Sequence, residues 1–302
     1  MQQSVLILGA GGKLGAHSAA AFAAAGWDVR RYRRGTDMTA AARGVDVIVN
    51  GLNPPNYHDW AGQLPRITAQ VIAAAKASGA TVILPGNVYN FGTAPAPWSE
   101  TTPQIPCSRK GQLRKDLEAA YRDSPVRTIV LRAGSFIDPD RADDVFSMIY
   151  LRALGRGRIT TPGGVEVPHA FCYLPDWARA AVMLADRRAD LAGFEDIPFP
   201  GHCLTTQDIR SELEAALGRP LKTVRFAWGM MRLASPFWEL ARELLEMRYL
   251  WDTPHWLSDT AFTRHLPDFR PADRATVIRA GSGQDVHPDK PMRPGGQPIV
   301  AQ

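Results

Sequence analysis

Three glycines near the start of the chain have the spacing of a phosphate-binding loop. Gly9, Gly12 and Gly15 follow a short apolar run and open an Ala-rich stretch with helical composition. In such a strand–turn–helix unit Gly9 allows the tight turn, Gly12 lets the backbone approach a pyrophosphate, and Gly15 lets the helix pack closely on the strand. Free N–H groups where the helix starts, at Lys13 and Leu14, hold the anion. The spacing therefore predicts a dinucleotide site rather than an ordinary turn.

A run of arginines lies where the second strand is predicted to end. The chain has 35 Lys and Arg against 30 Asp and Glu, a net charge of +5, and removing Arg30, Arg31, Arg33 and Arg34 would leave +1. An NAD site carries an acidic residue at this place, and Asp28 lies too early to serve. Guanidinium groups instead bind the 2′-phosphate of NADP bidentately. We therefore expect NADP, bound by Arg31, Arg33 and Arg34, with NAD as the less favoured cofactor.

Lys110 is a candidate catalytic residue because it is predicted to point inward. It begins a predicted helix over residues 109–121 and lies about 20° from Leu117 around the helix axis, on the apolar face. In the functional interpretation it hydrogen-bonds the nicotinamide ribose and relays a proton to the substrate. In the alternative interpretation its stem is buried and its ammonium group reaches water.

Further polar residues follow predicted strands at the carboxyl edge of the sheet, where open α/β sheets bind ligands. Tyr89 is a candidate proton donor, and Asn87 is a candidate for orienting a substrate carbonyl; Tyr89 packing beneath a second lobe is the alternative. The backbone after the third strand is expected to meet the cofactor ribose, through Asn50, Gly51, Leu52 and Asn53. The Pro- and aromatic-rich residues 54–60 form either a cover for the pocket or a surface turn.

Other conspicuous residues favour structural roles. His169 alternates with Phe171 and Tyr173 along a predicted strand, which fits a core histidine better than a substrate contact. Asp176 is interpreted as a helix cap. Four of the eight tryptophans lie in residues 228–256, which form the core of a lobe, an apolar substrate pocket or a helical dimer surface. No His, Asp or Glu spacing indicates a metal site.

The elements that must position these residues alternate between strand and helix. Apolar runs at residues 5–8, 27–32, 45–49, 81–84 and 126–131 predict strands, and residues 14–25, 64–78 and 109–121 predict helices. Runs of Val, Ile and Leu without alternation indicate strands covered on both faces. The expected fold is α/β, a doubly wound parallel sheet of the Rossmann type with a smaller, mostly helical C-terminal lobe.

The regular alternation of predicted strands and helices ends in the second half of the chain. We expect a helix over residues 141–155, a Gly-rich connection over 155–164, a strand over 170–174 that returns to the sheet, and a helix over 176–185. From residue 207 the pattern is helical, and residues 281–302 are Pro-rich without periodicity. The expected domains are residues 1–135 with 169–200 for the dinucleotide, 136–168 with 201–280 for the substrate, and an extended or mobile tail at 281–302.

Composition excludes several classes of protein. The chain has 302 residues, 45% hydrophobic and 22% charged, which excludes a disordered chain, a coiled coil and a collagen-like fibre. Three separated cysteines argue against a disulfide framework and fit a reducing compartment. No signal segment or membrane-spanning run is evident, so we expect a cytoplasmic protein that binds neither a membrane nor nucleic acid.

The motifs resemble the extended or atypical short-chain dehydrogenase/reductase superfamily. The resemblance rests on the glycine-rich opening, the Asn50–Gly51 turn, residues 87–92 (Asn-Val-Tyr-Asn-Phe-Gly) and the alternation of Asp176 with alanines, and it covers residues 1 to about 185. It implies a Rossmann domain with a small substrate lobe, a type often found in NAD-dependent epimerases and dehydratases.

Two of the family's three catalytic groups are replaced. The family's Ser or Thr position falls on Pro85, and its Tyr position falls on Pro106 if Lys110 is the family lysine. This pattern is similar to the atypical branch, in which some reductases keep the lysine without the tyrosine. The leading expectation is therefore an NADP-dependent oxidoreductase acting on a small carbonyl or enone. A nucleotide-sugar epimerase or dehydratase and a non-catalytic NADP sensor are the alternatives, and a homodimer is left open.

Overall fold

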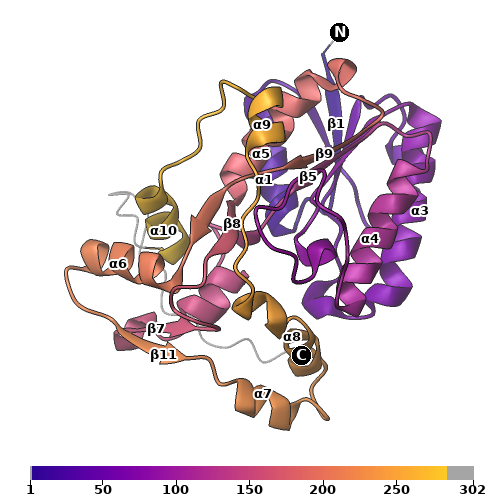
Figure 1. The fold of residues 1–302 in the computed structure, drawn as a ribbon. Coiled ribbons are helices and arrows are strands. Elements are labelled where there is room, and N and C mark those ends of the chain that lie inside the picture. Colours follow the sequence, from indigo (N-terminus) through magenta and orange to yellow (C-terminus); the bar gives the residue numbers. More distant parts are fainter. Residues whose placement is uncertain (1, 284–302) are drawn as a thin grey trace.

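A six-stranded parallel sheet, with five strands from the N-terminal half of the chain and one from the second half, forms the centre of the first lobe (Figure 1). We describe a computed structural model, and the structure describes residues 2–283. The strand order is β2-β1-β3-β4-β5-β9. The strands are β1 (Ser4–Leu8), β2 (Asp28–Arg31), β3 (Val47–Asn50), β4 (Thr81–Leu84), β5 (Thr128–Arg132) and β9 (Phe194–Pro198). The predicted α/β doubly wound sheet is confirmed, and its five predicted strands lie within about two residues of the observed ones.

Alternate residues of the central strands face two different helical layers. Val5 and Ile7 of β1 pack on one side with Phe22, whereas Leu6 and Leu8 pack on the other with Val71. The first layer contains α1 (Lys13–Ala24) and α5 (Leu174–Asp186); the second contains α2 (Met38–Ala41), α3 (Trp60–Ser78) and α4 (Arg109–Arg122). Apolar strands without a polar face follow from burial on both sides.

Smaller sheets and short helices form the second lobe, at the lower left and bottom of Figure 1. One sheet has the order β10-β8-β6, and β7 pairs in parallel with β11. These strands are β6 (Ser135–Ile137), β7 (Arg158–Thr161), β8 (His169–Tyr173), β10 (His202–Leu204) and β11 (Lys222–Arg225). The helices of this lobe are α6 (Thr206–Leu217), α7 (Trp228–Ala234), α8 (Glu239–Glu246) and α10 (Arg274–Ser282), whereas α9 (Thr260–His265) packs against β9 of the central sheet, near the top of Figure 1. Across residues 2–283, every helix is too short or too polar to traverse a lipid bilayer.

The strand expected at residues 170–174 does not return to the central sheet. It is β8, and it pairs with β6 and β10. The close approach of β6 and β8 requires Gly134, because a Cβ atom there would lie 2.2 Å from the Ala170 carbonyl oxygen. The sixth strand of the central sheet is β9 instead, and the sequence analysis predicted no strand at its position.

Two further expectations for the second half are wrong. The helix predicted over residues 141–155 is reduced to two short turns, Phe146–Tyr150 and Leu154–Arg156, because Asp144 accepts hydrogen bonds from the backbone N–H groups of Asp138 and Ser147 and fixes a bend. The Gly-rich connection over 155–164 contains β7, which is stabilised by a distant partner, β11. Of the predicted tail, residues 281 and 282 belong to α10, and residues 284–302 lie outside the described part.

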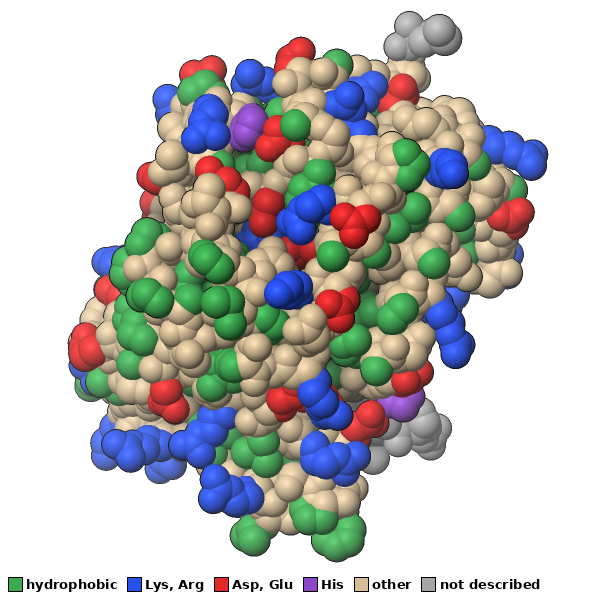
Figure 2. All heavy atoms as spheres, turned by 45° about the vertical axis from the view of Figure 1, so that its right-hand side comes forward, with side chains coloured by type: hydrophobic (Ala, Val, Ile, Leu, Met, Phe, Trp, Pro, Cys, Tyr) green, Lys and Arg blue, Asp and Glu red, His purple; other side chains and the backbone are tan. Residues whose placement is uncertain are grey.

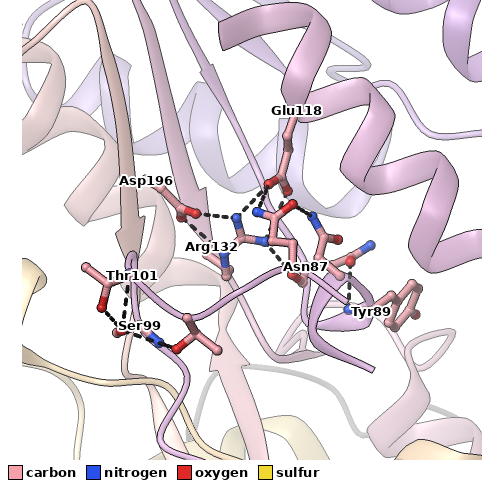
Figure 3. Close-up of polar contacts among 10 residues, drawn as sticks. Asn87, Tyr89, Ser99, Thr101, Glu118, Arg132 and Asp196 are labelled. Atoms are coloured by element: carbon pink, nitrogen blue, oxygen red, sulfur yellow. Dashed lines mark hydrogen bonds and ion pairs between the residues drawn. The ribbon is translucent and has the colours of Figure 1, made fainter. Parts of the chain in front are cut away.

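A buried ion cluster joins three elements at the carboxyl edge of the sheet (Figure 3). Arg132, at the end of β5, is fully buried and contacts Glu118 of α4 at 2.7 Å and Asp196 of β9 at 2.5 Å. Burial alone would lower the pKa of Arg132, but attraction by Asp196 and Glu118 outweighs it and raises that pKa. Arg132 also donates a 2.6 Å hydrogen bond to the carbonyl of Asn87, which fixes the loop after β4.

Replacing Arg132 with Met should destabilise the fold by about 3–5 kcal/mol, since Glu118 and Asp196 would be left buried without their cation. Urea unfolding measures the change. The matched control is Arg66→Met on the exposed side of α3, for which we expect a change within about 0.5 kcal/mol. If Arg132→Met lowers the free energy of unfolding no more than Arg66→Met does, then groups other than Arg132 stabilise the carboxylates of Glu118 and Asp196.

Candidate functional site

The glycine loop has the geometry of a phosphate-binding turn. Gly9 has a φ of 74°, and a Cβ atom there would lie 2.8 Å from the carbonyl oxygen of Gly51. A Cβ atom at Gly15 would lie 2.2 Å from the carbonyl oxygen of Gly9. Gly12, the residue before α1, donates a 2.8 Å hydrogen bond to that same oxygen. Larger residues at Gly9 and Gly15 would therefore open the turn, and the first N–H groups of α1 point out of it.

A segment of the second lobe lies against this loop. The ammonium group of Lys13 contacts Asp143 at 3.0 Å, and Arg141 donates a hydrogen bond to the carbonyl of Gly11. Leu14 is buried in the core between α1 and the sheet. Of the two side chains after Gly12, Leu14 serves packing, and Lys13 holds the neighbouring segment.

The arginine run lies at the carboxyl end of β2, beside β1 and the glycine loop. Arg30 is paired with Asp28 at 3.1 Å and donates to the carbonyl of Arg43, so both are engaged elsewhere. Arg31, Arg33 and Arg34 are exposed. No hydrogen bond or ion pair connects these three guanidinium groups to any residue in 2–283. They are therefore free to bind an anion.

The residues after β3 lie next to the glycine loop, but two of their side chains have internal partners, and their contact with a cofactor ribose stays a prediction. The side-chain amide of Asn50 is buried; its Nδ2 donates to the hydroxyl of Tyr121 at 3.1 Å, and its Oδ1 accepts from the N–H of Leu52. The Gly51 N–H donates to the carbonyl of Leu8. Asn53 accepts a 2.7 Å hydrogen bond from Arg114 of α4. The backbone of this turn, more than its side chains, faces the space beside the loop.

Tyr89 has a hydroxyl partner that the sequence did not indicate. Its oxygen lies 3.1 Å from that of Tyr57, which comes from the Pro- and aromatic-rich segment after β3. Tyr57 has a φ of 62°, and its neighbours Asn56 and Asp59 also have positive φ, conformations that cost energy in non-glycine residues. Asn87 accepts the N–H of Tyr89 at 3.0 Å and so fixes the turn that carries it (Figure 3). Burial and the adjacent Tyr89 raise the pKa of Tyr57 well above its ordinary value.

Lys110 is buried, as its place on the helix predicted, and its charge is held by the second lobe. Its ammonium group contacts Glu243 and, at 2.7 Å, Glu246 of α8. It also lies 5.0 Å from the ring centre of Tyr57. Burial would raise the pKa of Glu246, but hydrogen bonds from Lys110 lower it below its usual value. The fold thus joins Lys110 and Tyr57 to α8, and the role of Lys110 toward a cofactor stays a prediction.

Arg114 belongs to the same face of α4 but escaped the sequence analysis. It lies four residues after Lys110 and therefore one turn away on the helix. Its guanidinium stacks 4.6 Å from the ring of Trp60 while it donates to Asn53. Its Nε atom is buried with no hydrogen-bond partner. Its position four residues after the inward Lys110 could have predicted that Arg114 also points inward.

Two cavities adjoin Tyr57. The larger, about 430 Å³, is bounded by Lys110, Trp60 and the acidic residues of α8. The smaller, about 70 Å³, lies at the sheet edge, with Asn87 and Tyr89 on one side. The rest of its wall combines two histidines with apolar side chains, including Val145, Ile149, His169, Leu244, Trp251 and His255. The segment at residues 54–60 therefore borders a pocket instead of forming a plain surface turn.

The two histidines in the smaller cavity are neutral. Their ring centres lie 4.9 Å apart. Burial lowers the pKa of His169 to about 3 and that of His255 to about 4. His169 packs against Trp251, so it combines the expected core role with a place in the cavity wall.

Asp176 and the tryptophan-rich stretch also differ from expectation. Asp176 does not cap α5, whose preceding residue is Tyr173; it accepts from the N–H of Ala272 and pairs with Arg179. Within residues 228–256, Trp228 and Trp251 are buried, but Trp238 and Trp256 are exposed. The stretch is therefore only partly core. His17, Asp138 and Asp140 meet beside α1, where His17 and Asp138 form a 2.9 Å hydrogen bond.

No protein-family model matches the sequence, and no curated protein is significantly similar to it. Solved structures share its fold. One is MoeE5 in complex with UDP-glucose and NAD, with 16% identity, a TM-score of 0.71, and coverage of 93% of this chain and 98% of that one. UDP-glucuronic acid 4-epimerase from Bacillus cereus, in complex with UDP-glucuronic acid and NAD, gives the same four values. The NAD-dependent NDP-hexosamine 5,6-dehydratase TunA has 17% identity, a TM-score of 0.69, and coverage of 94% and 97%.

These likenesses extend over nearly the whole chain, including the lobe for which the sequence resemblance was loose. At this level of identity they establish the fold. The predicted architecture is confirmed: the chain has a Rossmann-type α/β fold, and the structures that share it include NAD-dependent sugar-nucleotide epimerases and dehydratases.

Proposed function

We propose that the protein is an enzyme that binds a nicotinamide dinucleotide and carries out hydride-transfer chemistry at a hydroxyl- or carbonyl-bearing carbon. The observation that carries this proposal is the glycine loop. Gly9 and Gly15 leave no room for a Cβ atom, and the loop opens at the carboxyl edge of a parallel sheet. In open α/β sheets that edge binds dinucleotides. The cofactor supplies the hydride chemistry when bound.

The substrate class best supported is a nucleotide sugar. Structures that share the fold over nearly its full length were solved with NAD and with UDP-glucose or UDP-glucuronic acid. The sequence-based alternative of an epimerase or dehydratase is thereby better supported than the leading expectation of a small-carbonyl reductase. The replaced family residues at Pro85 and Pro106 then mean that other groups of this chain move the proton.

The tyrosine pair is the group best placed for that proton transfer. Tyr89 borders the smaller cavity and is hydrogen-bonded to Tyr57. Because burial raises the pKa of Tyr57, its hydroxyl keeps its proton, so it can donate a hydrogen bond to the Tyr89 oxygen after Tyr89 has given its own proton to a substrate oxygen. Lys110 lies 5.0 Å from the ring centre of Tyr57 and is paired with Glu243 and Glu246. Asn87 keeps Tyr89 in place through its N–H.

A small apolar carbonyl or enone is the second candidate substrate, and one specific observation favours it. The wall of the smaller cavity is largely hydrophobic, with Val145, Ile149, Leu244 and Trp251 opposite Tyr89. Such a wall fits an apolar substrate with one polar group.

For the cofactor we propose NADP, although the solved structures named above hold NAD. The proposal rests on the exposed side chains of Arg31, Arg33 and Arg34 beside the glycine loop, and on Asp28 being paired with Arg30. Guanidinium groups match a 2′-phosphate, and an unpaired cluster of three cations is relieved by an anion.

The function is tested by incubating the purified chain with two substrate panels. One panel holds UDP-glucose and UDP-glucuronic acid together with NAD or NADP, and the other holds apolar ketones and enones together with NADH or NADPH, which supply the hydride. Products are followed by NMR as well as by nicotinamide absorbance, since an epimerase returns its hydride and leaves no net change in the cofactor. Conversion of a UDP-sugar supports the main proposal. Conversion of the apolar panel alone supports the second candidate, and cofactor binding with no turnover in either panel supports a sensor.

Gly12→Asp should abolish cofactor binding while leaving the protein folded. The substitution adds a carboxylate where the pyrophosphate approaches the backbone, and its Cβ atom would lie 3.2 Å from the carbonyl oxygen of Gly9. Calorimetric titration measures binding. Gly193→Asp is the control, because no atom lies within 4 Å of its added Cβ and it lies at the far end of the sheet. Undiminished binding by Gly12→Asp would place the phosphate site elsewhere.

Changing Arg33 and Arg34 together to Ala should weaken NADPH binding by about 2–4 kcal/mol and hardly alter NADH binding. Each charge-assisted hydrogen bond to a phosphate contributes about 1.5–3 kcal/mol, and neighbouring contributions are not additive. Parallel titrations of both cofactors measure the difference. If the unaltered protein binds NADH as tightly as NADPH, the proposed 2′-phosphate site is refuted.

Lys110→Met should lower kcat by about 10²- to 10⁴-fold if Lys110 assists proton transfer. The change keeps the apolar stem and removes the charge. Because Glu243 and Glu246 also lose their partner, the control is Lys110→Met combined with Glu243→Gln and Glu246→Gln, which removes the uncompensated carboxylates. Recovery of kcat in the combined variant would make Lys110 a tether for α8, whereas weaker cofactor binding with unchanged kcat would make it a ribose ligand.

A further inference from the structure

Helix α7 and the turn that joins it to α8 expose large apolar side chains. Met230 is 66% exposed, Leu233 81%, Phe237 94% and Trp238 46%. The N–H groups of Phe237 and Trp238 both donate to the carbonyl of Ala234, which holds them at one turn. We call these four side chains the α7–α8 tip. Contiguous exposed apolar residues of this size mark an interaction surface.

Exposed basic side chains accompany the tip. Arg225, Arg232 and Arg242 are exposed, and Arg242 donates to the carbonyl of Ser235 within the turn itself. The acidic residue between positions 225 and 242 is Glu239, which is paired with His58 at 3.0 Å. In Figure 2 the lower end of the molecule shows hydrophobic side chains with Lys and Arg just above them. The exposed charged side chains of residues 225–242 are therefore three arginines and Glu239, which gives the apolar surface a positive excess.

The charge of this surface distinguishes between two occupants. In a two-fold dimer the same patch lies on both partners, so its three arginines would face their own copies, and the acidic residue of the segment, Glu239, is already paired with His58. An anionic lipid surface supplies both complements, because aromatic and aliphatic side chains enter the interfacial region and arginines bind phosphate head groups.

We propose that the α7–α8 tip docks the protein reversibly on anionic lipid membranes. This departs from the sequence-based expectation of no membrane partner and does not depend on the proposed catalytic function. The α7–α8 tip adjoins the candidate site because α8 follows it directly. Glu239, Glu243 and Glu246 of α8 border the larger cavity, and Leu244 borders the smaller one. Docking of the tip therefore brings this side of the site close to the lipid surface.

The test is flotation of the full chain with vesicles of phosphatidylcholine alone or mixed with phosphatidylserine. We expect binding to the mixed vesicles, weakened by salt, with a blue shift of tryptophan fluorescence from Trp238. Leu233→Ser with Phe237→Ser should reduce binding by about tenfold or more. Arg232→Ala with Arg242→Ala should reduce it by about fivefold per arginine. Ile105→Ser, at an exposed isoleucine outside the tip (70%), should bind as the parent does.

Absence of binding to the mixed vesicles by the unaltered protein overturns the proposal. So does equal loss of binding in Ile105→Ser and in the tip variant. A dimer in sedimentation equilibrium that dissociates in Leu233→Ser with Phe237→Ser, without vesicle binding, would assign the tip to a second copy of this chain. Circular dichroism of each variant establishes that it is folded, and Met230→Ser replaces a variant that is not.

Discussion

The buried ion cluster of Arg132 determines the geometry of the sheet edge on which the candidate site depends. One cation is shared by two carboxylates from different elements, Glu118 of α4 and Asp196 of β9. A buried cluster of this kind tolerates few arrangements, because any displacement leaves a charge unpaired in a medium of low polarity. Its bond to the carbonyl of Asn87 extends the constraint to the loop that carries Tyr89. The candidate proton donor is thus positioned by an interaction within the core.

A second set of contacts ties the C-terminal lobe to this edge. Lys110 on α4 pairs with Glu243 and Glu246 on α8, and the strained turn around Tyr57 brings its hydroxyl to Tyr89. Both cavities border Tyr57. Because strain in a non-glycine residue persists only where its surroundings fix it, α8 and the sheet edge together hold the turn in place. Movement of α8 would change the charge around Lys110 and the position of Tyr57 together.

The sequence predicted what depends on local pattern. Apolar runs such as residues 81–84 predicted the buried strands of the doubly wound sheet, and the glycine spacing predicted the loop. The helical period placed Lys110 on the apolar face of its helix and so predicted its inward direction. The sequence did not predict contacts between distant residues. The carboxylate partners of Lys110 lie over 130 positions away in the sequence. The addition of β9 to the central sheet and the pairing of β7 with β11 likewise depend on tertiary packing, which local hydrophobic periodicity does not predict.

The central claim is that the glycine loop and the tyrosine pair belong to a single site. A crystal structure of the protein grown with NADPH tests it most directly. We predict that the pyrophosphate binds the N–H groups at the start of α1, that the 2′-phosphate contacts Arg33 or Arg34, and that the nicotinamide ring lies beside Tyr89. A cofactor bound away from the glycine loop, or bound there with its nicotinamide ring remote from both Tyr89 and Lys110, would contradict this account.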